Sequence, residues 1–188
     1  FVTVPDRGPY GNFADLYGDG SYETSFALLV YQARVVRFEL NEATAVIEDL
    51  SEVLLTREDG TTPITGRPNI PGVDEVPVDL FGNELGYDEF GADLEGVVIA
   101  DDGSFWMVDE YRPAIYNFDA TGQLINRFVA EGTADLAGET AGTFGTETLP
   151  AEYSSRRPNR GIEAVALDTD ENLLYAFIQT PLANPDRA

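Results

Sequence analysis

Carboxylate side chains stand at both ends of a short segment whose pattern is typical of a β-hairpin. The apolar run 97–100 and the strand-like segment 104–108 are joined by an Asp-Asp-Gly turn signal. Asp93 and Glu95 precede the first strand, and Glu110 follows the second. Because the open ends of an antiparallel hairpin lie side by side, the sequence predicts that these carboxylates gather at one edge of a sheet.

A second segment follows the same plan. Glu163 precedes the apolar run 164–167, an acidic turn follows, and a return strand is predicted over 173–178. Repeated β units with polar residues at one end favour a propeller or a sandwich over a helical fold. We therefore expect Glu163 to face the same side as the carboxylates of the first hairpin.

The residue types limit the chemistry that such a cluster can perform. The chain has no cysteine and no histidine, which excludes thiol catalysis, Cys/His zinc sites and a Ser-His-Asp triad within it. Carboxylates are oxygen ligands for hard cations, and Ca²⁺ fits them better here than Mg²⁺. The predicted metal ligands are Asp93, Glu95, Glu110 and Glu163.

Two arginines and two amides are expected near these carboxylates. Arg7 and Arg160, each beside a glycine, would offset their charge or hold an anionic substrate. Asn159 and Gln179 are neutral groups that could complete a coordination sphere or contact a substrate. The structural alternatives are that Glu95 only pairs with an arginine, that the arginines hold packed β units together, and that the amides hold loop backbone.

The rest of the chain contains further strand candidates and two long connections. Strands are predicted over 26–32, 33–40 and 44–55, and the runs 114–119 and 124–130 extend the first hairpin to four antiparallel strands. Residues 58–92 and 131–158 are long insertions rich in turn residues, and such loops usually cover a site or pack on a face. The basic group at 154–157 is interpreted as a solvated loop, with anion binding as the alternative.

Charge and length exclude several partners. The 188 residues carry a formal charge of −23, and every basic residue is an arginine. Such a surface repels nucleic acid and anionic membranes, and no apolar run is long enough to span a membrane. Much of the acidity can be explained as a solvated coat. Both ends lie within β units, so we expect a piece of a longer fold whose open sheet edges are covered by the remainder or by another chain.

Six motifs follow one another along the chain. They are Asp6-Arg7-Gly8, Asp93-Leu94-Glu95-Gly96, GSFWMVDEY (103–111), IYNFDATG (115–122), Asn159-Arg160-Gly161-Ile162-Glu163 and Gln179-Thr180-Pro181-Leu182. Their order resembles the phytase-like family, described as "esterase-like activity of phytase". The resemblance spans nearly the whole chain, although the long insertion after Glu131 and the extreme acidity depart from the family. It implies an all-β propeller, with residues 1–188 forming about half of a six-bladed domain of four-stranded blades, and secretion into the periplasm or the medium.

Two functions from different classes are consistent with these residues. The first is metal-dependent hydrolysis of a phosphate or another ester. A bound cation can polarise a phosphoryl oxygen and activate water where no histidine or cysteine is present. The candidate catalytic residues are Glu95, Glu110, Glu163 and Arg160. The second is a non-catalytic propeller that acts as a binding or assembly subunit. The sequence contains candidate ligands but no evident protein nucleophile.

Overall fold

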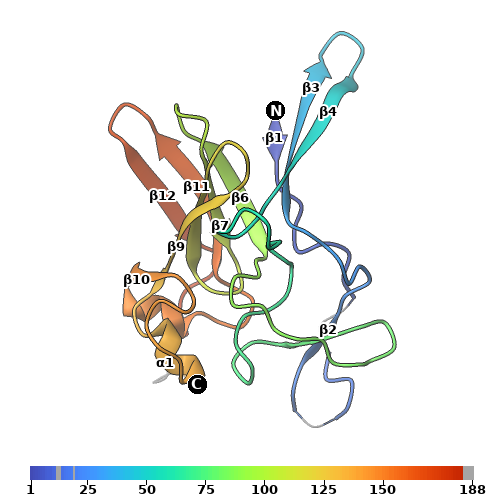
Figure 1. The fold of residues 1–188 in the computed structure, drawn as a ribbon, viewed down its shortest axis with the longest axis vertical. Helices are drawn as coiled ribbons and strands as arrows, with labels where there is room; N and C mark the ends of the chain where they lie inside the picture. The colour runs from blue at the N-terminus through green and yellow to red at the C-terminus, as the bar shows by residue number, and fades with distance from the viewer. Residues whose placement is uncertain (12–13, 19, 184–188) are drawn as a thin grey trace.

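The structure is a computed structural model that describes residues 1–11, 14–18 and 20–183 of the chain, and it is built almost entirely of strands (Figure 1). None of the helices in these residues is long and apolar enough to cross a membrane. The elements in chain order are β1 (Val2–Thr3), β2 (Glu23–Ser25), β3 (Arg34–Asn41), β4 (Val46–Leu54), β5 (Val76–Val78), β6 (Leu94–Ile99), β7 (Phe105–Asp109), β8 (Ala114–Phe118), β9 (Leu124–Ala130), α1 (Thr133–Ala137), β10 (Thr146–Leu149), the 3₁₀ turn Ala151–Ser155, β11 (Ile162–Asp168) and β12 (Leu173–Ile178).

Four consecutive antiparallel strands, β6 to β9, form the central sheet, which confirms the order predicted for the middle of the chain. Short turns join these strands, and Gly103 and Gly122 take the positive φ that such turns need (84° and 90°). A fifth strand, β10, runs parallel to β9 at the outer edge. The sequence did not predict β10, because its pairing with β9 is set by tertiary contacts.

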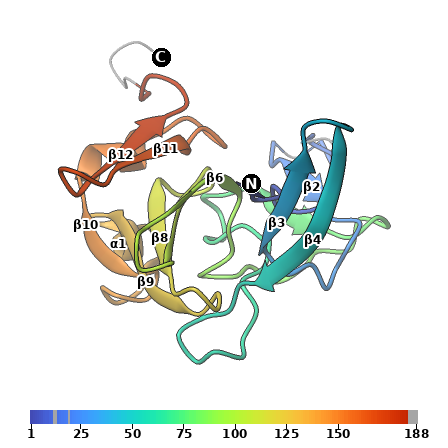
Figure 2. The ribbon, with the colours of Figure 1, turned by 90° about the horizontal axis from the view of Figure 1, so that it is seen from above.

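Two smaller sheets stand on either side of the central one (Figures 1 and 2). β1, β3 and β4 form one, and the β11–β12 hairpin forms the other. β6 is the central strand that contacts both, because it touches β1 on one side and β11 on the other. The two flanking sheets therefore meet at the strand that begins with the predicted ligands.

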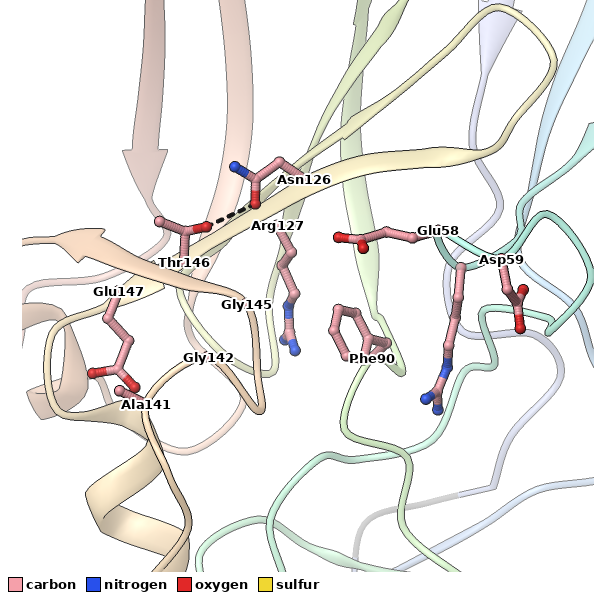
Figure 3. Close-up of a pocket in the computed structure, with 11 residues that line it drawn as sticks. Glu58, Asp59, Phe90, Asn126, Arg127, Ala141, Gly142, Gly145, Thr146 and Glu147 are labelled. Atoms are coloured by element: carbon pink, nitrogen blue, oxygen red, sulfur yellow. Dashed lines mark hydrogen bonds between the residues drawn. The ribbon is translucent and has the colours of Figure 1, made fainter.

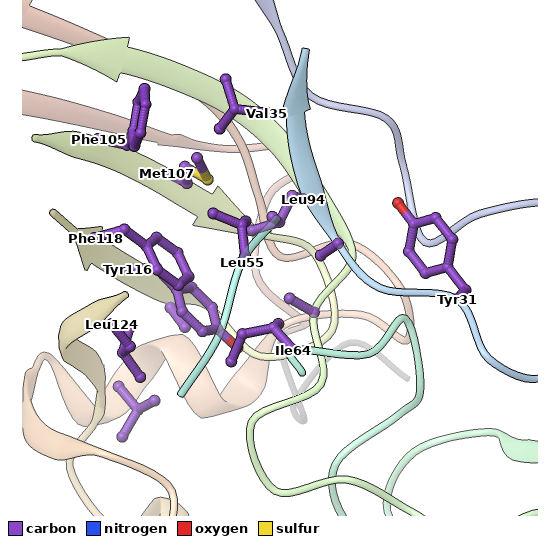
Figure 4. Close-up of a cluster of buried hydrophobic side chains, with 14 residues drawn as sticks. Tyr31, Val35, Leu55, Ile64, Leu94, Phe105, Met107, Tyr116, Phe118 and Leu124 are labelled. Atoms are coloured by element: carbon purple, nitrogen blue, oxygen red, sulfur yellow. The ribbon is translucent and has the colours of Figure 1, made fainter. Parts of the chain in front are cut away.

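The main hydrophobic core fills the space between the central sheet and the β3–β4 side of the molecule (Figure 4). Paired residues of β7 and β8 supply one face, where Phe105 lies opposite Phe118 and Met107 opposite Tyr116. Val35 packs against them from β3. Fully burying a side chain of this size contributes roughly 1.5–3 kcal/mol, so this core holds the central sheet against the N-terminal segments.

The opposite face of the central sheet is covered by the β11–β12 hairpin. Gly96 of β6 permits the close approach, since a Cβ atom there would lie 3.0 Å from Cγ1 of Val165 in β11. The strands alternate, so the other face of the hairpin exposes Leu173, Tyr175 and Phe177. One face of the β11–β12 hairpin is therefore apolar and exposed in the described part of the chain.

The strand prediction over 26–32 is wrong. Phe26 makes an isolated bridge with Tyr10, and the chain then turns, with the Tyr31 N–H donating to the carbonyl of Leu28. The turn directs Tyr31 back toward the N-terminal segment, where its hydroxyl donates to the carbonyl oxygen of Asp6 at 2.6 Å. This tertiary contact overrides the local preference of an apolar run for an extended strand.

The two long insertions are not structureless. Residues 58–92 contain β5, which pairs in parallel with β2, and residues 131–158 contain α1, β10 and the 3₁₀ turn. The first insertion also brings Asp74 and Glu75 to buried arginines. It therefore covers the region that the predicted ligands occupy.

Candidate functional site

Two glutamates occupy equivalent places at the starts of β6 and β11. The β6–β7 pairing passes from Leu94 opposite Asp109 to Gly96 opposite Val108, so Glu95 is an extra residue in its strand. The β11–β12 pairing passes from Ile162 to Ala164 in the same way and leaves Glu163 extra. A β-bulge turns the side chain of the extra residue out of the regular alternation, which explains how two strands aim carboxylates at one point.

The structure brings three of the predicted ligands together. One carboxylate oxygen from each of Glu95, Glu110 and Glu163 lies within 4.8 Å of the others. Glu110 is buried directly after β7, and Glu95 and Glu163 are half-buried. We call this group the carboxylate triad.

Residues 159 and 160 hold Glu110 in this position. The side-chain amide of Asn159 donates to Oε2 at 2.8 Å, and Arg160 Nη1 donates to Oε1 at 3.2 Å. Asn159 has a positive φ of 49°, which asparagine tolerates better than most residues. Gly161 follows without a side chain, and a Cβ atom there would lie 2.4 Å from the Glu110 carbonyl oxygen.

Several buried oxygens at and beyond the triad have no hydrogen-bond partner among the described residues. They are Glu163 Oε2, Asn159 Oδ1 and, after β12, Thr180 Oγ1. An unsatisfied buried oxygen costs free energy and usually indicates a bound water or ion. The triad therefore combines convergent carboxylate oxygens with nearby oxygens that have no hydrogen-bond partner, as a cation site does.

Burial and mutual repulsion change the acidity of the triad. Burial, together with the charges of Asp6, Glu163 and Glu110, raises the pKa of Glu95 to about 7. Burial and the charge of Glu163 raise the pKa of Glu110 to about 7 as well, although Arg160 opposes the change. A divalent cation would relieve this repulsion.

Asp93 lies with a different set of carboxylates. Its carboxylate, that of Asp6 and that of Glu95 each offer an oxygen within 4.8 Å of the other two. Arg7 adjoins this second set, with Nε 3.3 Å from Asp93 Oδ2 and Nη1 2.6 Å from Glu75 Oε1. Arg7 therefore pairs with Asp93 and Glu75 instead of forming an ion pair with the triad, whereas Arg160 does pair with Glu110.

Gln179 is exposed, and its main-chain N–H donates to the carbonyl of Gly161 at 2.9 Å.

The interpretation of 154–157 as a solvated loop is wrong for Arg156, because its side chain is 7% exposed and its Nη2 lies 3.0 Å from Asp74 Oδ1. Asp74 is buried between Arg156 and Arg112. Sequence reasoning missed Asp74 because it lies in an irregular, proline-rich loop without periodicity.

A hollow of about 340 Å³ adjoins the triad. Asp74, Glu75, Arg156 and Asn159 are among its lining residues. Two of these residues bind groups of the two carboxylate sets: the Asn159 amide donates to Glu110 of the triad, and Glu75 accepts from Arg7, which pairs with Asp93. A small polar molecule in this hollow would therefore contact the residues that bind Glu110 and Arg7, although no residue of the triad lines it.

A separate cavity of about 710 Å³ lies between the turn after β4 and the loop before β10 (Figure 3). Phe90 lies there between Arg57 and Arg127, and both arginines already have acidic partners. None of the predicted ligands lines it. It therefore offers no unpaired cation for an anionic substrate among its described residues.

Comparison with known proteins identifies the family. The whole chain, residues 1–188, matches the phytase-like family, described as esterase-like activity of phytase. An "Uncharacterized secreted protein" from Arthroderma benhamiae is 31% identical over 162 residues, which cover 73% of this chain and 31% of that protein, so the chain spans about a third of the relative's length. No solved structure matches the chain. The chain belongs to the phytase-like family.

Proposed function

We propose that the carboxylate triad of Glu95, Glu110 and Glu163 binds Ca²⁺. The ligands are all oxygens, the donors that Ca²⁺ prefers at roughly 2.4 Å, and since they lie within 4.8 Å of one another a single ion can contact all three. Mg²⁺ is less suitable because its shorter bonds, about 2.1 Å, need a tighter octahedral set. Asn159 Oδ1 is the additional oxygen best placed to join the coordination sphere, because it is buried without a hydrogen bond.

The activity that this site supports best is hydrolysis of a phosphate ester or another ester. The observation that carries this proposal is the presence of three convergent carboxylates with an unpartnered Glu163 oxygen beside a hollow that contains Arg156. A bound Ca²⁺ would polarise the ester oxygen and increase the acidity of water. Arg160 and Asn159 orient Glu110, and Arg7, Arg160 and Arg156 lie near the place where an anionic substrate would enter.

The architecture that we propose is a partial β-propeller comprising residues 1–188, with insertions at about 58–92 and 131–158. The four antiparallel strands β6 to β9 match one blade, and β11–β12 packs beside β6 as the start of the next. The exposed face with Leu173, Tyr175 and Phe177 would then be covered by the remaining blades or by another chain. The secreted relative supports a location outside the cell.

A non-catalytic role in binding or assembly is the second candidate. It is favoured by the arginine pairs, because Arg160 holds Glu110, and Arg7 joins Asp93 to Glu75 across distant segments. In that role the carboxylates and arginines would hold neighbouring β units together, and a bound ion would add stability without turnover.

Turnover of p-nitrophenyl phosphate with and without Ca²⁺ distinguishes the two candidates. The informative variant is Glu163→Gln. Glu163 Oε2 accepts no hydrogen bond from the described residues, so its replacement removes a charge without breaking a hydrogen bond at that atom. As an enzyme, the protein should need Ca²⁺, and the variant should lose roughly tenfold or more in rate with little change in melting temperature. Glu171→Gln, on the exposed turn of the same hairpin, is the matched control.

Unchanged turnover in Glu163→Gln would contradict catalysis at the triad. Absence of turnover, combined with Ca²⁺ binding that raises the melting temperature, would favour the assembly role. Absence of Ca²⁺ binding by calorimetry would contradict the metal site itself.

A further inference from the structure

Glu95 belongs to two sets of carboxylates at once. One set is the triad, and the other combines Glu95 with Asp6 and Asp93. In each set, one carboxylate oxygen of every residue lies within 4.8 Å of the others. A carboxylate has two oxygens and can therefore bind two cations at the same time. The bulge at Glu95 places this side chain between β1, which precedes Asp6, and β11, which carries Glu163.

The second set contains a buried oxygen of its own without a partner. Asp93 is 1% exposed, and its Oδ1 has no hydrogen-bond partner in the part of the chain that the structure describes, although Oδ2 lies 3.3 Å from Arg7 Nε. Burial, contact with the carboxyl group of Asp6 and the charges of Asp6 and Glu95 raise the pKa of Asp93 well above its ordinary value. Two carboxylates in contact, one of them buried as Asp93 is, are stabilised by a shared proton or by a cation between them.

Arg7 does not meet this need. Its Nη1 is committed to Glu75 at 2.6 Å and to the Tyr111 hydroxyl at 3.0 Å, and its guanidinium lies over the Tyr10 ring at 4.1 Å. Its Nε is shared between Asp93 Oδ2 at 3.3 Å and Asp6 Oδ1 at 3.8 Å, so one guanidinium serves three carboxylates, and Asp93 Oδ1 keeps no partner among the described residues. The arginine thus fixes one oxygen of Asp93 and leaves the other available.

The charge balance favours a second cation. When ionised, the five carboxylates of the two sets and Glu75 carry six negative charges, and Arg7 and Arg160 offset two of them. One divalent cation would leave two negative charges in this partly buried region, whereas two cations would neutralise it. A neutral centre would also no longer repel an anionic ester.

We propose that Asp6, Asp93 and Glu95 form a second divalent-cation site and that Glu95 bridges it to the ion in the triad. This inference rests on the proposed Ca²⁺ site and adds a second ion with its own ligands. The two ions have different neighbours, because Arg7 adjoins the Asp6–Asp93 ion and Arg160 adjoins the triad ion. A phosphate or carboxylate group could then span the pair, as in sites where two ions clamp one substrate.

Calcium titration of the chelator-treated protein tests the stoichiometry, with isothermal calorimetry and native mass spectrometry as readouts that do not depend on activity. We expect two Ca²⁺ per chain in the unaltered protein and one in Asp6→Asn, because the asparagine keeps an oxygen for the Arg7 N–H but removes the charge. Glu163→Gln should also bind one ion. Glu95→Gln should weaken both sites.

Asp102→Asn, in the exposed turn between β6 and β7, is the matched control and should still bind two ions. Binding of one ion to the unaltered protein and to Asp6→Asn, with loss in Glu163→Gln, would overturn the second site and leave the triad site intact. Absence of tight binding in every protein would overturn both. Circular dichroism of each variant excludes loss of folding as the cause.

Discussion

Glu95 and Glu163 are the extra residues of two β-bulges, at the same position in two successive hairpins. Each bulge comes at the start of its first strand, and both carboxylates reach the same cluster although the residues are far apart in sequence. Bulges are common next to functional sites because they redirect one side chain without altering the rest of the strand. The repeated bulge is therefore the local device that forms the cluster.

Gly161→Ala should destabilise the protein and disturb Glu110. A Cβ atom at position 161 would lie 2.4 Å from the carbonyl oxygen of Glu110, so the segment after β7 must move. The expected cost is about 1–3 kcal/mol, as for other overpacked positions. Urea denaturation measures it. Gly86→Ala is the control, because a Cβ atom there meets nothing within 4 Å, and an equal loss in both variants would contradict the packing argument.

The contribution of Glu95 and Glu110 to the free energy of unfolding should fall with rising pH in the ion-free protein and rise with pH when Ca²⁺ is present. The pKa values of Glu95 and Glu110 are raised to about 7, chiefly by burial. Between the unfolded value near 4.3 and 7, the folded protein keeps protons that the unfolded chain has released. The ion-free protein should therefore lose stability as the pH rises from 5 to 8.

With Ca²⁺, deprotonation favours the bound state, so the contribution from these residues should increase over the same range. Melting curves at pH 5 and pH 8, in EDTA and in excess Ca²⁺, provide the comparison. Parallel slopes in the two conditions would show that these carboxylates do not bind the ion.

Arg127→Met should be strongly destabilising. The Arg127 side chain and that of Asp109 are fully buried, with Nη2 3.2 Å from Oδ2. Removal of the arginine leaves a buried carboxylate without its charge partner, which costs roughly 3–5 kcal/mol. Arg57→Met is the control, because Arg57 is 30% exposed and should lose much less. Chemical denaturation of both variants tests the difference, and equal losses would contradict it.

The local pattern of the sequence predicted the four antiparallel strands β6 to β9 and the β11–β12 hairpin. Alternating apolar residues are decisive there: β9 and β12 have the predicted bounds, 124–130 and 173–178. The same pattern predicted that Glu95, Glu110 and Glu163 would converge, because the open ends of adjacent hairpins must lie together. The sequence could not predict the bulges, since register depends on pairing that local preferences do not determine.

The partners of the arginines were beyond local reasoning. Glu75 and Asp74 come from an irregular loop, and their contacts with Arg7, Arg112 and Arg156 depend on how that loop folds over the sheet. Asp6 comes shortly after β1, which ends at Thr3, as Glu110 comes after β7, and this similarity was the available signal for its place in the second set. Short-range patterns thus predict strands, whereas long-range contacts select the ion pairs.

The two sets draw ligands from positions 6, 93, 95, 110 and 163, so no short stretch of the chain contains a complete set. The oxygens meet only after the N-terminal segment and the last hairpin have docked on β6. An ion bound there would favour the docked arrangement over any partly assembled chain, and its release would loosen the joints between the β units before it affects the interior of any one of them.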